Sequence, residues 1–318
     1  RAQVEGSVLP KFLASQRWFA GKGAPIDGVR LSEYGPWESS NGRWLMSLMD
    51  VESRGETTRY FLPLTIVFED AEETRWSKLQ PAAFARVRQQ ATVGVLADAV
   101  ADDVFCRSLV EAIGAGVMHR TEHGTIAFTP TKAFAELRGD PAAPLTAGQQ
   151  FGQSSNSTLR VGDRFFLKVY RKLQPGLNPE LEIGRFLTDV AHFPSCVPVA
   201  GAVEYRGGDG TIHTLALLQA FVQNQGDGWD YTLNYLMRFL EDRRGGSDPP
   251  QDAHGVYFEL MRMLAQRTAE LHVALASNDD DPAFAPEPIT ADDLRLWQSS
   301  IQADARATLE LLSATEPL

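Results

Sequence analysis

Residues 151–190 read FGQSSNSTLRVGDRFFLKVYRKLQPGLNPELEIGRFLTDV, and this stretch decides the fold. Between two runs typical of strands, residues 153–158 form a loop of small polar side chains. A turn at Gly162 and Asp163 begins a further strand, which carries Lys168 in an otherwise apolar run. Asn178 and Pro179 then fit a helix cap and a first helical residue. The stretch predicts a hairpin that presents a lysine, followed by a helix that supplies glutamates.

Lys168 needs an anionic partner, because a lysine within an apolar strand is costly to remove from water unless it is paired. The following helix offers Glu180 and Glu182. We expect Glu182 to be the partner, since apolar residues after it indicate that this side of the helix faces the sheet: Ile183, Phe186 and Val190. Glu180 is the alternative, and its charge would otherwise serve the helix N-terminus. A strand lysine held by a helical glutamate is how kinase-like folds contact nucleotide phosphates.

Two further segments fit a nucleotide. The loop at 153–158 can bring backbone N–H groups and hydroxyls close to phosphate oxygens, although the same residue types also form ordinary hairpin turns. Downstream, the apolar run that begins at Thr214 gives way at residues 219–222. In kinase-like folds the link between the two lobes exposes backbone groups that contact adenine, and residues 219–222 would be that link. The alternative is an edge strand that ends in a loop.

The composition limits the class of partner. A formal net charge of −11 over 318 residues argues against a general nucleic-acid surface, which needs clustered lysine and arginine. Cys106 and Cys196 lie in apolar stretches and are expected to be free thiols, as in a reducing cytoplasm. No apolar run is long enough to predict a membrane span. We therefore expect a cytoplasmic protein with small-molecule or protein partners. The chain begins with Arg1, and we expect it to be cut from a longer polypeptide or renumbered after trimming.

The rest of the chain reads as an α/β unit before the hairpin and mainly helices after it. A short first helix carries Leu9, Phe12 and Leu13 on one side. A helix that begins after Asp102 as its N-cap is expected to run to about residue 113. The other expected elements are a hairpin at 43–52 and 58–68, a helical segment within 81–101, strands at 125–130, 198–206 and 211–222, and helices from 227, at 255–276 and at 291–312.

Several segments together resemble a known family. They are QRWFAGKG at 16–23, QSSNST followed by GDRFFLKVYRKL, NPELEIGRFLTD, LALLQAFVQNQGDGWDY at 215–231, and RTAELHVALA at 267–276. In this order they resemble maltokinases, in particular the maltokinase region that follows trehalose synthase in bacterial fusion proteins. The resemblance extends from about residue 8 to residue 312, and is more specific than any one of the motifs alone.

The resemblance implies an α+β, protein-kinase-like fold of the aminoglycoside phosphotransferase kind. Residues 1–95 would be an N-terminal cap domain, 96–222 a small lobe that holds the nucleotide, and 223–318 part of an α-helical large lobe. The implied reaction is transfer of the γ-phosphate of ATP to maltose with Mg²⁺, which gives maltose 1-phosphate for α-glucan and glycogen synthesis. The expected nucleotide contacts are Ser155, Asn156, Ser157 and Thr158 in the phosphate loop, Lys168 with Glu182 as its partner, and Gln219, Phe221 and Val222 at adenine.

One departure from the family is large. Maltokinases place an H-G-D catalytic loop and a D-F-E metal segment after the helix that is expected to end near residue 312. None of the six histidines here is followed at the second position by aspartate, so the general base is absent from this sequence. We expect a truncated large lobe, Mg²⁺ ligands and most maltose contacts in a missing C-terminal part, and no activity of this chain alone. We also expect self-association, because the helices at 255–276 and 291–312 would lack part of their core.

Two other functions stay open at this stage. The chain could be a non-catalytic module that binds nucleotide or assembles with trehalose synthase. It could instead belong to a kinase of another small hydroxyl substrate, such as an amino alcohol or an aminoglycoside. The segment at 16–23 weighs against the latter, since the other kinases of this fold lack such a cap.

Overall fold

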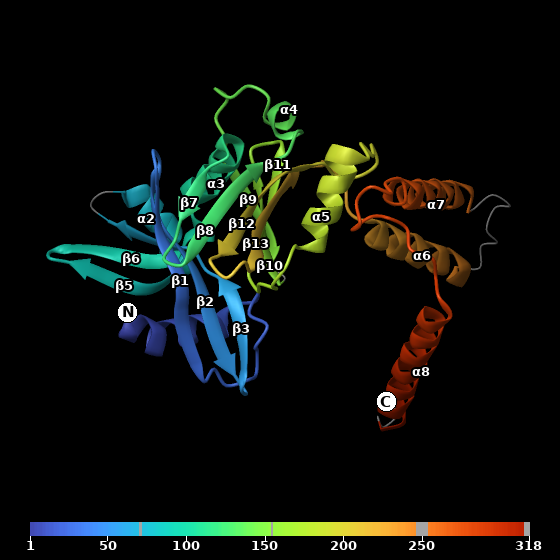
Figure 1. Ribbon diagram of the computed structural model, residues 1–318, viewed down its shortest axis with the longest axis horizontal. Coiled ribbons are helices and arrows are strands. Elements are labelled where there is room, and N and C mark those ends of the chain that lie inside the picture. Colours follow the sequence, from blue (N-terminus) through green and yellow to red (C-terminus); the bar gives the residue numbers. More distant parts are fainter. Residues whose placement is uncertain (70–71, 154, 246–253, 315–318) are drawn as a thin grey trace. The chain divides into compact units, whose positions relative to one another are not determined.

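The computed structural model describes residues 1–69, 72–153, 155–245 and 254–314. They belong to two compact units, residues 1–258 and 259–318, and each is described by itself. The first unit contains two antiparallel sheets, whose strands are coloured blue to cyan and green to gold in Figure 1.

The first sheet has six strands in the order β1-β2-β4-β6-β5, with β3 paired to β2. Before it, a π-helical turn at Val4–Val8 leads into α1 (Leu9–Ser15), and α2 (Glu73–Leu79) lies between β4 and β5 in the chain. Arg54 and Gly55 both have positive φ angles and make the tight turn between β2 and β3. The strands are β1 (Gly28–Ser39), β2 (Gly42–Ser53), β3 (Glu56–Phe61), β4 (Leu64–Phe68), β5 (Ala83–Gln89) and β6 (Thr92–Asp98).

The second sheet has seven strands in the order β7-β8-β12-β13-β11-β10-β9. They are β7 (Met118–Arg120), β8 (Gly124–Pro130), β9 (Ala147–Gln153), β10 (Asn156–Val161), β11 (Phe165–Tyr170), β12 (Val199–Gly207) and β13 (Ile212–Ala220). Its helices are α3 (Asp103–Ala115), α4 (Phe134–Arg138) and α5 (Pro179–Arg185), and a π-helical turn at Phe186–Val190 continues α5. The polar loop and lysine strand of the sequence thus lie at one side of this sheet, next to α5 (Figure 1).

Residues of both sheets share one apolar core. Trp37 of β1 stacks on Phe128 of β8, with ring centroids 5.2 Å apart. Trp44 of β2 meets Phe105 of α3 edge to face, with centroids 5.6 Å apart. All four rings are almost fully buried, so separating the sheets would expose a large aromatic surface.

Three helices follow the second sheet. They are α6 (Gly228–Arg244), α7 (Gly255–Leu275) and α8 (Ala291–Ala314), of which α8 and most of α7 belong to the second unit. Asp227 caps α6 by accepting a hydrogen bond from the N–H of Asp230 at 2.8 Å. None of the helices in the described part of the chain combines the length and the apolarity that crossing a membrane requires.

Much of the expected secondary structure is confirmed. The first helix buries Leu9, Phe12 and Leu13 as expected, and the strands at 125–130, 198–206 and 211–222 correspond to β8, β12 and β13. Asp102 caps α3 by accepting from the N–H of Val104. The free thiols are confirmed, and burial raises the pKa of Cys106.

Other expectations about the first sheet were wrong. The segment within 81–101 is not helical; it forms β5, β6 and a 3-10 turn, because pairing β6 with β4 buries Val95 and Ala97. The strand expected at 58–68 is divided at Pro63, which has no N–H to donate to a sheet, into β3 and β4. The pattern of apolar residues in the sequence also failed to predict the helix α2 (Glu73–Leu79).

Candidate functional site

Lys168 and Glu180 form the centre of the candidate site. Lys168 lies on β11, opposite Thr158 of β10 and Leu217 of β13. Its Nζ is 2.6 Å from Oε2 of Glu180 on α5, and the Tyr170 hydroxyl donates to the same oxygen at 2.8 Å. Burial, and then the contact with Glu180, raise the pKa of Tyr170, so its hydroxyl remains a donor at physiological pH. The carboxylate is thereby fixed by two donors from one strand.

The expected partner of Lys168 was the wrong glutamate. Asn178 caps α5 by accepting from the N–H of Glu180 at 2.9 Å, which places Glu180 in the first turn beside β11. Glu182 follows two residues later, about 200° further around the helix axis, and therefore lies on another side. The apolar pattern was misleading because Ile183 is 40% exposed, whereas Leu181 is the residue that α5 buries completely.

The residues of the expected phosphate loop divide between two faces of β10. Asn156 pairs with Tyr170 and Thr158 pairs with Lys168, so by strand alternation these two share the face of the lysine. Ser157 is on the opposite face, is buried, and accepts a hydrogen bond from Nε of Arg171 at 2.9 Å. The expectation that the Ser157 side chain lines a phosphate site is therefore wrong. Ser155 is exposed just before the strand, and residue 154 of the motif lies outside the described residues.

A cavity of about 290 Å³ adjoins the lysine face. Ser155, Asn156, Tyr170, Lys172 and Thr214 line it, together with the segment 174–179 that leads into α5. Oγ1 of Thr214 is buried there and has no hydrogen-bond partner among the residues that the structure describes. The lining is thus partly polar and partly apolar, and it extends from the hairpin to Asn178, whose side chain accepts from the N–H of Glu180.

The expected adenine link is partly occupied by protein contacts. The N–H of Phe221 donates to the carbonyl of Arg164 at 2.6 Å, and the N–H of Ala220 donates to that of Pro198 at 2.9 Å. Gln219 is still within β13, while Val222 is half exposed and its carbonyl accepts from Asn224. Adenine contacts at Gln219, Phe221 and Val222 stay a prediction, in which Phe221 would have to use its carbonyl or its ring.

Sequence reasoning missed one residue of this region, Arg171. It follows β11 directly and is only 2% exposed, although it is charged. Its guanidinium is 4.9 Å from the ring of Trp18, within the QRWFAGKG segment, and it forms an ion pair with Asp98. The sequence did contain a signal for a buried arginine, because Arg171 directly follows the lysine strand and lies between the apolar residues Tyr170 and Leu173. The structure buries both of these neighbours.

Comparison with known proteins explains the first sheet. Residues 12–102, which include all six of its strands, match a family described as the maltokinase N-terminal cap domain. This segment is similar to maltokinase N-terminal cap domains, and we call the chain up to the end of β6 the cap domain. The expected likeness of the QRWFAGKG segment to a maltokinase cap is thereby confirmed. Trp18, which belongs to this segment, lies against the guanidinium of Arg171.

Solved structures of glucosamine kinase have the same fold. One, in complex with glucosamine, ADP and inorganic phosphate, has a TM-score of 0.51, and a second crystal form has a TM-score of 0.52. Each is 18% identical in sequence, and the match covers 92% of this chain. The chain spans only 56% of the length of those kinases. The likeness confirms the expected kinase-like fold.

Proposed function

We propose that this chain is the cap and nucleotide-holding part of a maltokinase, an enzyme that transfers the γ-phosphate of ATP to maltose to give maltose 1-phosphate. The observation that carries the proposal is the ion pair of Lys168 and Glu180, on a kinase-like sheet that is joined to a maltokinase cap domain. We place the end of the cap domain at Asp98, where β6 ends, rather than at residue 95. The small lobe would then continue to 222, and 223–318 would be part of the large lobe.

The residues of the site fit the phosphates of ATP. Lys168 would contact the α and β phosphates, and Glu180 and Tyr170 would hold its ammonium group in place. The side chains of Asn156 and Thr158 would lie along the phosphate chain, on the face of the lysine. Phosphoryl transfer depends mainly on such positioning and on neutralising charge. The nucleotide-binding residues of the proposal are therefore Ser155, Asn156, Thr158, Lys168, Glu180, Gln219, Phe221 and Val222.

The described residues supply no metal site built from three protein ligands. In the described ranges, no three side chains of His, Cys, Asp or Glu converge as metal ligands. The sequence also has no histidine followed at the second position by aspartate. We therefore derive no step through Mg²⁺, and propose that this polypeptide alone binds nucleotide without transferring phosphate.

Calorimetric titration with ATP and a maltose-dependent ADP-release assay test this function. We expect weak ATP binding that Lys168→Met abolishes, and no ADP release above background when maltose is added. Wild-type protein that does not bind ATP would contradict nucleotide holding, and maltose-dependent ADP release would contradict inactivity. Adding glucosamine in place of maltose tests a second candidate substrate, which the likeness to glucosamine kinase favours.

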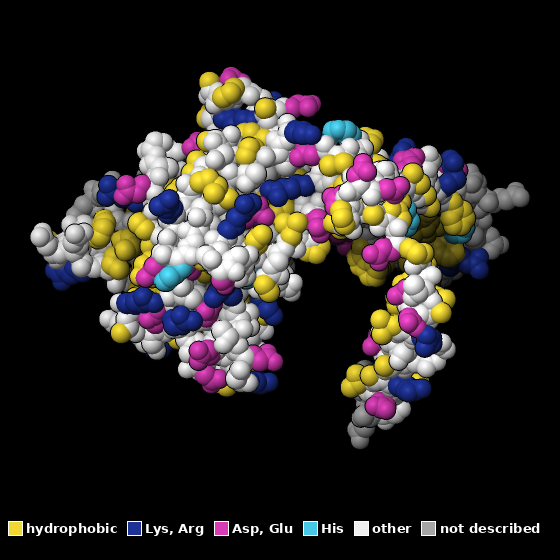
Figure 2. Space-filling model, viewed as in Figure 1, with side chains coloured by type: hydrophobic (Ala, Val, Ile, Leu, Met, Phe, Trp, Pro, Cys, Tyr) yellow, Lys and Arg dark blue, Asp and Glu magenta, His cyan; other side chains and the backbone are white. Residues whose placement is uncertain are grey.

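The expected partners remain part of the proposal. The resemblance to fusion proteins supports a trehalose synthase domain as partner, and the free thiols of Cys106 and Cys196 are compatible with the cytoplasm. Self-association was expected through the helices at 255–276 and 291–312, and it is supported there by Phe258, 62% exposed, and Leu294, 57% exposed. The side chains of α6 add to this support, since Trp229 is 71% exposed and Leu236 is 44% exposed. Hydrophobic side chains also lie exposed among charged ones on the C-terminal helices in Figure 2.

A further inference from the structure

The side chain of Arg171, which directly follows β11, contacts Asp98 at the end of β6 and Ser157 on β10. Nη2 and Nη1 donate to the two carboxylate oxygens of Asp98, at 2.6 and 3.2 Å. Nε donates in the remaining direction, to Oγ of Ser157 at 2.9 Å. A buried guanidinium with a bidentate carboxylate and a third acceptor has its charge and its geometry well satisfied.

The two acceptors belong to different sheets. Asp98 ends β6 of the cap domain, and its carboxylate also accepts from the N–H of Val100 at 3.0 Å, so its position is fixed. Ser157 belongs to β10, the strand whose other face carries Asn156 and Thr158 beside Lys168. The guanidinium therefore ties the last strand of the cap domain to the strand that would hold the phosphates.

The cap domain also holds the backbone around Arg171. The N–H of Phe61 donates to the carbonyl of Arg171 at 2.8 Å, and the N–H of Leu173 donates to the carbonyl of Arg59 at 2.8 Å. The chain thus leaves β11 of the second sheet and pairs at once with β3 of the first. With the Trp18 ring against the guanidinium, the cap domain surrounds Arg171 on several sides.

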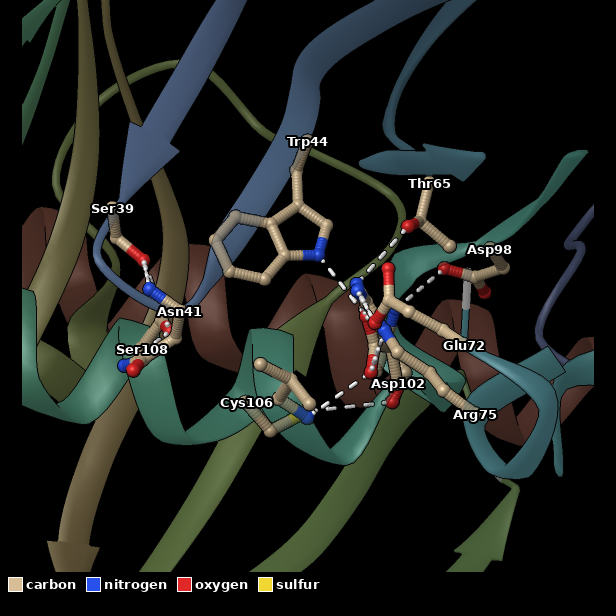
Figure 3. Close-up of polar contacts among 12 residues, drawn as sticks. Ser39, Asn41, Trp44, Thr65, Glu72, Arg75, Asp98, Asp102, Cys106 and Ser108 are labelled. Atoms are coloured by element: carbon tan, nitrogen blue, oxygen red, sulfur yellow. Dashed lines mark hydrogen bonds and ion pairs between the residues drawn. The ribbon is translucent and has the colours of Figure 1, made fainter. Parts of the chain in front are cut away.

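A second cluster joins the cap domain to α3 without touching the hairpin, and it supplies the control. Asp102 accepts from Nε1 of Trp44 at 3.1 Å and from Nε of Arg75 at 3.1 Å. Figure 3 shows Trp44 and Arg75 pointing toward this carboxylate. Like Arg171, Arg75 has a mostly buried side chain and a carboxylate partner, but it makes no contact with Ser157.

We propose that Arg171 is a positioning residue through which the cap domain fixes the strand β10, and with it the nucleotide site. Anchoring Ser157 on the buried face sets the position of its neighbours Asn156 and Thr158 on the lysine face. Lysine cannot replace this arginine, because an ammonium group lacks the planar fork that reaches Asp98 and Ser157 together. Nucleotide binding at β10 should in turn stabilise the cap domain, since coupling between sites is reciprocal. The effect on the nucleotide site and this last consequence rest on the proposed function, whereas the fixing of β10 does not.

Amide hydrogen exchange of the full chain without nucleotide tests the link directly. Ser157→Ala removes one hydrogen bond and leaves the ion pair with Asp98, so the protein should fold. We expect the amides of β10 to exchange about tenfold faster in Ser157→Ala and in Arg171→Lys, while those of β12 keep their rate. Ser47→Ala, which removes another buried hydroxyl of the cap domain, and Arg75→Lys should leave β10 unchanged. Unchanged exchange of β10 in Ser157→Ala, or an equal increase in Arg75→Lys, would overturn the proposal.

Titration of the same variants with ATP separates this inference from the proposed function. Ser157→Ala should weaken ATP binding about fivefold, while Ser47→Ala should not change it. Equal ATP affinities of wild type and Ser157→Ala would refute the effect on the nucleotide site. If wild type does not bind ATP, the proposed function fails, and the exchange of β10 alone decides the role of Arg171.

Discussion

Nζ of Lys168 and Oε2 of Glu180 are 2.6 Å apart, and the Tyr170 hydroxyl donates to the same oxygen. The pair joins β11 to the first turn of α5, so the lysine is held in one position before any nucleotide arrives. Its side chains are partly exposed, which limits what the pair contributes to folding. Its larger effect should therefore be on the orientation of the ammonium group.

Glu180→Gln should weaken ATP binding about fivefold to tenfold, because Lys168 loses its charged partner and gains other orientations. The unfolding free energy should fall by less than about 1 kcal/mol. Calorimetric titration and urea denaturation measure the two effects. Glu182→Gln is the matched control, with the same chemical change on another side of α5, and should bind ATP like wild type. Equal losses in the two variants would show that Glu180 has no special role.

The lysine and the helix cap could be predicted from the sequence because both are local signals. Lys168 interrupts an apolar strand, and Asn178 before Pro179 begins a helix. The choice between Glu180 and Glu182 depended on which side of α5 faces the sheet, and its short apolar pattern gave the wrong answer because exposed Ile183 resembled a core residue.

The contacts of the cap domain could not be predicted in the same way. Asp98 and Arg171 are separated by 73 residues, and neither position carries a local pattern that indicates the other. Ser157 belonged to a motif that suggested phosphate binding, yet pairing with β11 turned it to the buried face. Long-range pairing likewise made strands of β5 and β6, where a helix was expected.

Glu33 predicts a pH dependence of stability. Its carboxylate, on β1, accepts from the N–H of His123 at 3.0 Å and from the Tyr205 hydroxyl at 2.9 Å. Burial alone would raise the pKa of Glu33, but these donors outweigh burial and lower it below the ordinary 4.5. The stabilisation is therefore complete above about pH 4.5, and is lost as the pH falls through the lower pKa of the folded state.

Glu33→Gln should lower the unfolding free energy at pH 7 by about 1–3 kcal/mol. The difference from wild type should shrink below about pH 4.5, as the wild-type carboxylate becomes protonated. Urea denaturation at a series of pH values measures both effects. Glu52→Gln, at an exposed position of β2, serves as the control and should differ little from wild type at any pH. A difference for Glu33→Gln that grows toward acid pH would contradict the sign of this argument.

Replacing Phe128 with alanine tests whether the two sheets unfold together. Because its ring stacks on Trp37 of the cap domain, Phe128→Ala should cost about 3–5 kcal/mol. Tryptophan fluorescence, which includes the cap domain, and far-UV circular dichroism should give the same lowered urea midpoint. Val93→Ala, at a position that is 38% exposed, should shift the midpoint little. Separate midpoints for the two signals would mean that the cap domain unfolds independently of the second sheet.

The apolar side chains of α6 predict association that a charge on the helix should prevent. Leu233 and Leu236 are 41% and 44% exposed, so replacing both with glutamate should leave the helix intact while disrupting a hydrophobic contact. Sedimentation velocity should show species above the chain mass of 35.0 kDa for wild type, increasing with concentration, and mainly monomer for the double variant. Asn234→Glu adds a carboxylate at an exposed neighbouring position outside this apolar pair and should associate like wild type. A wild-type protein that stays monomeric over the whole concentration range would rule out association through α6.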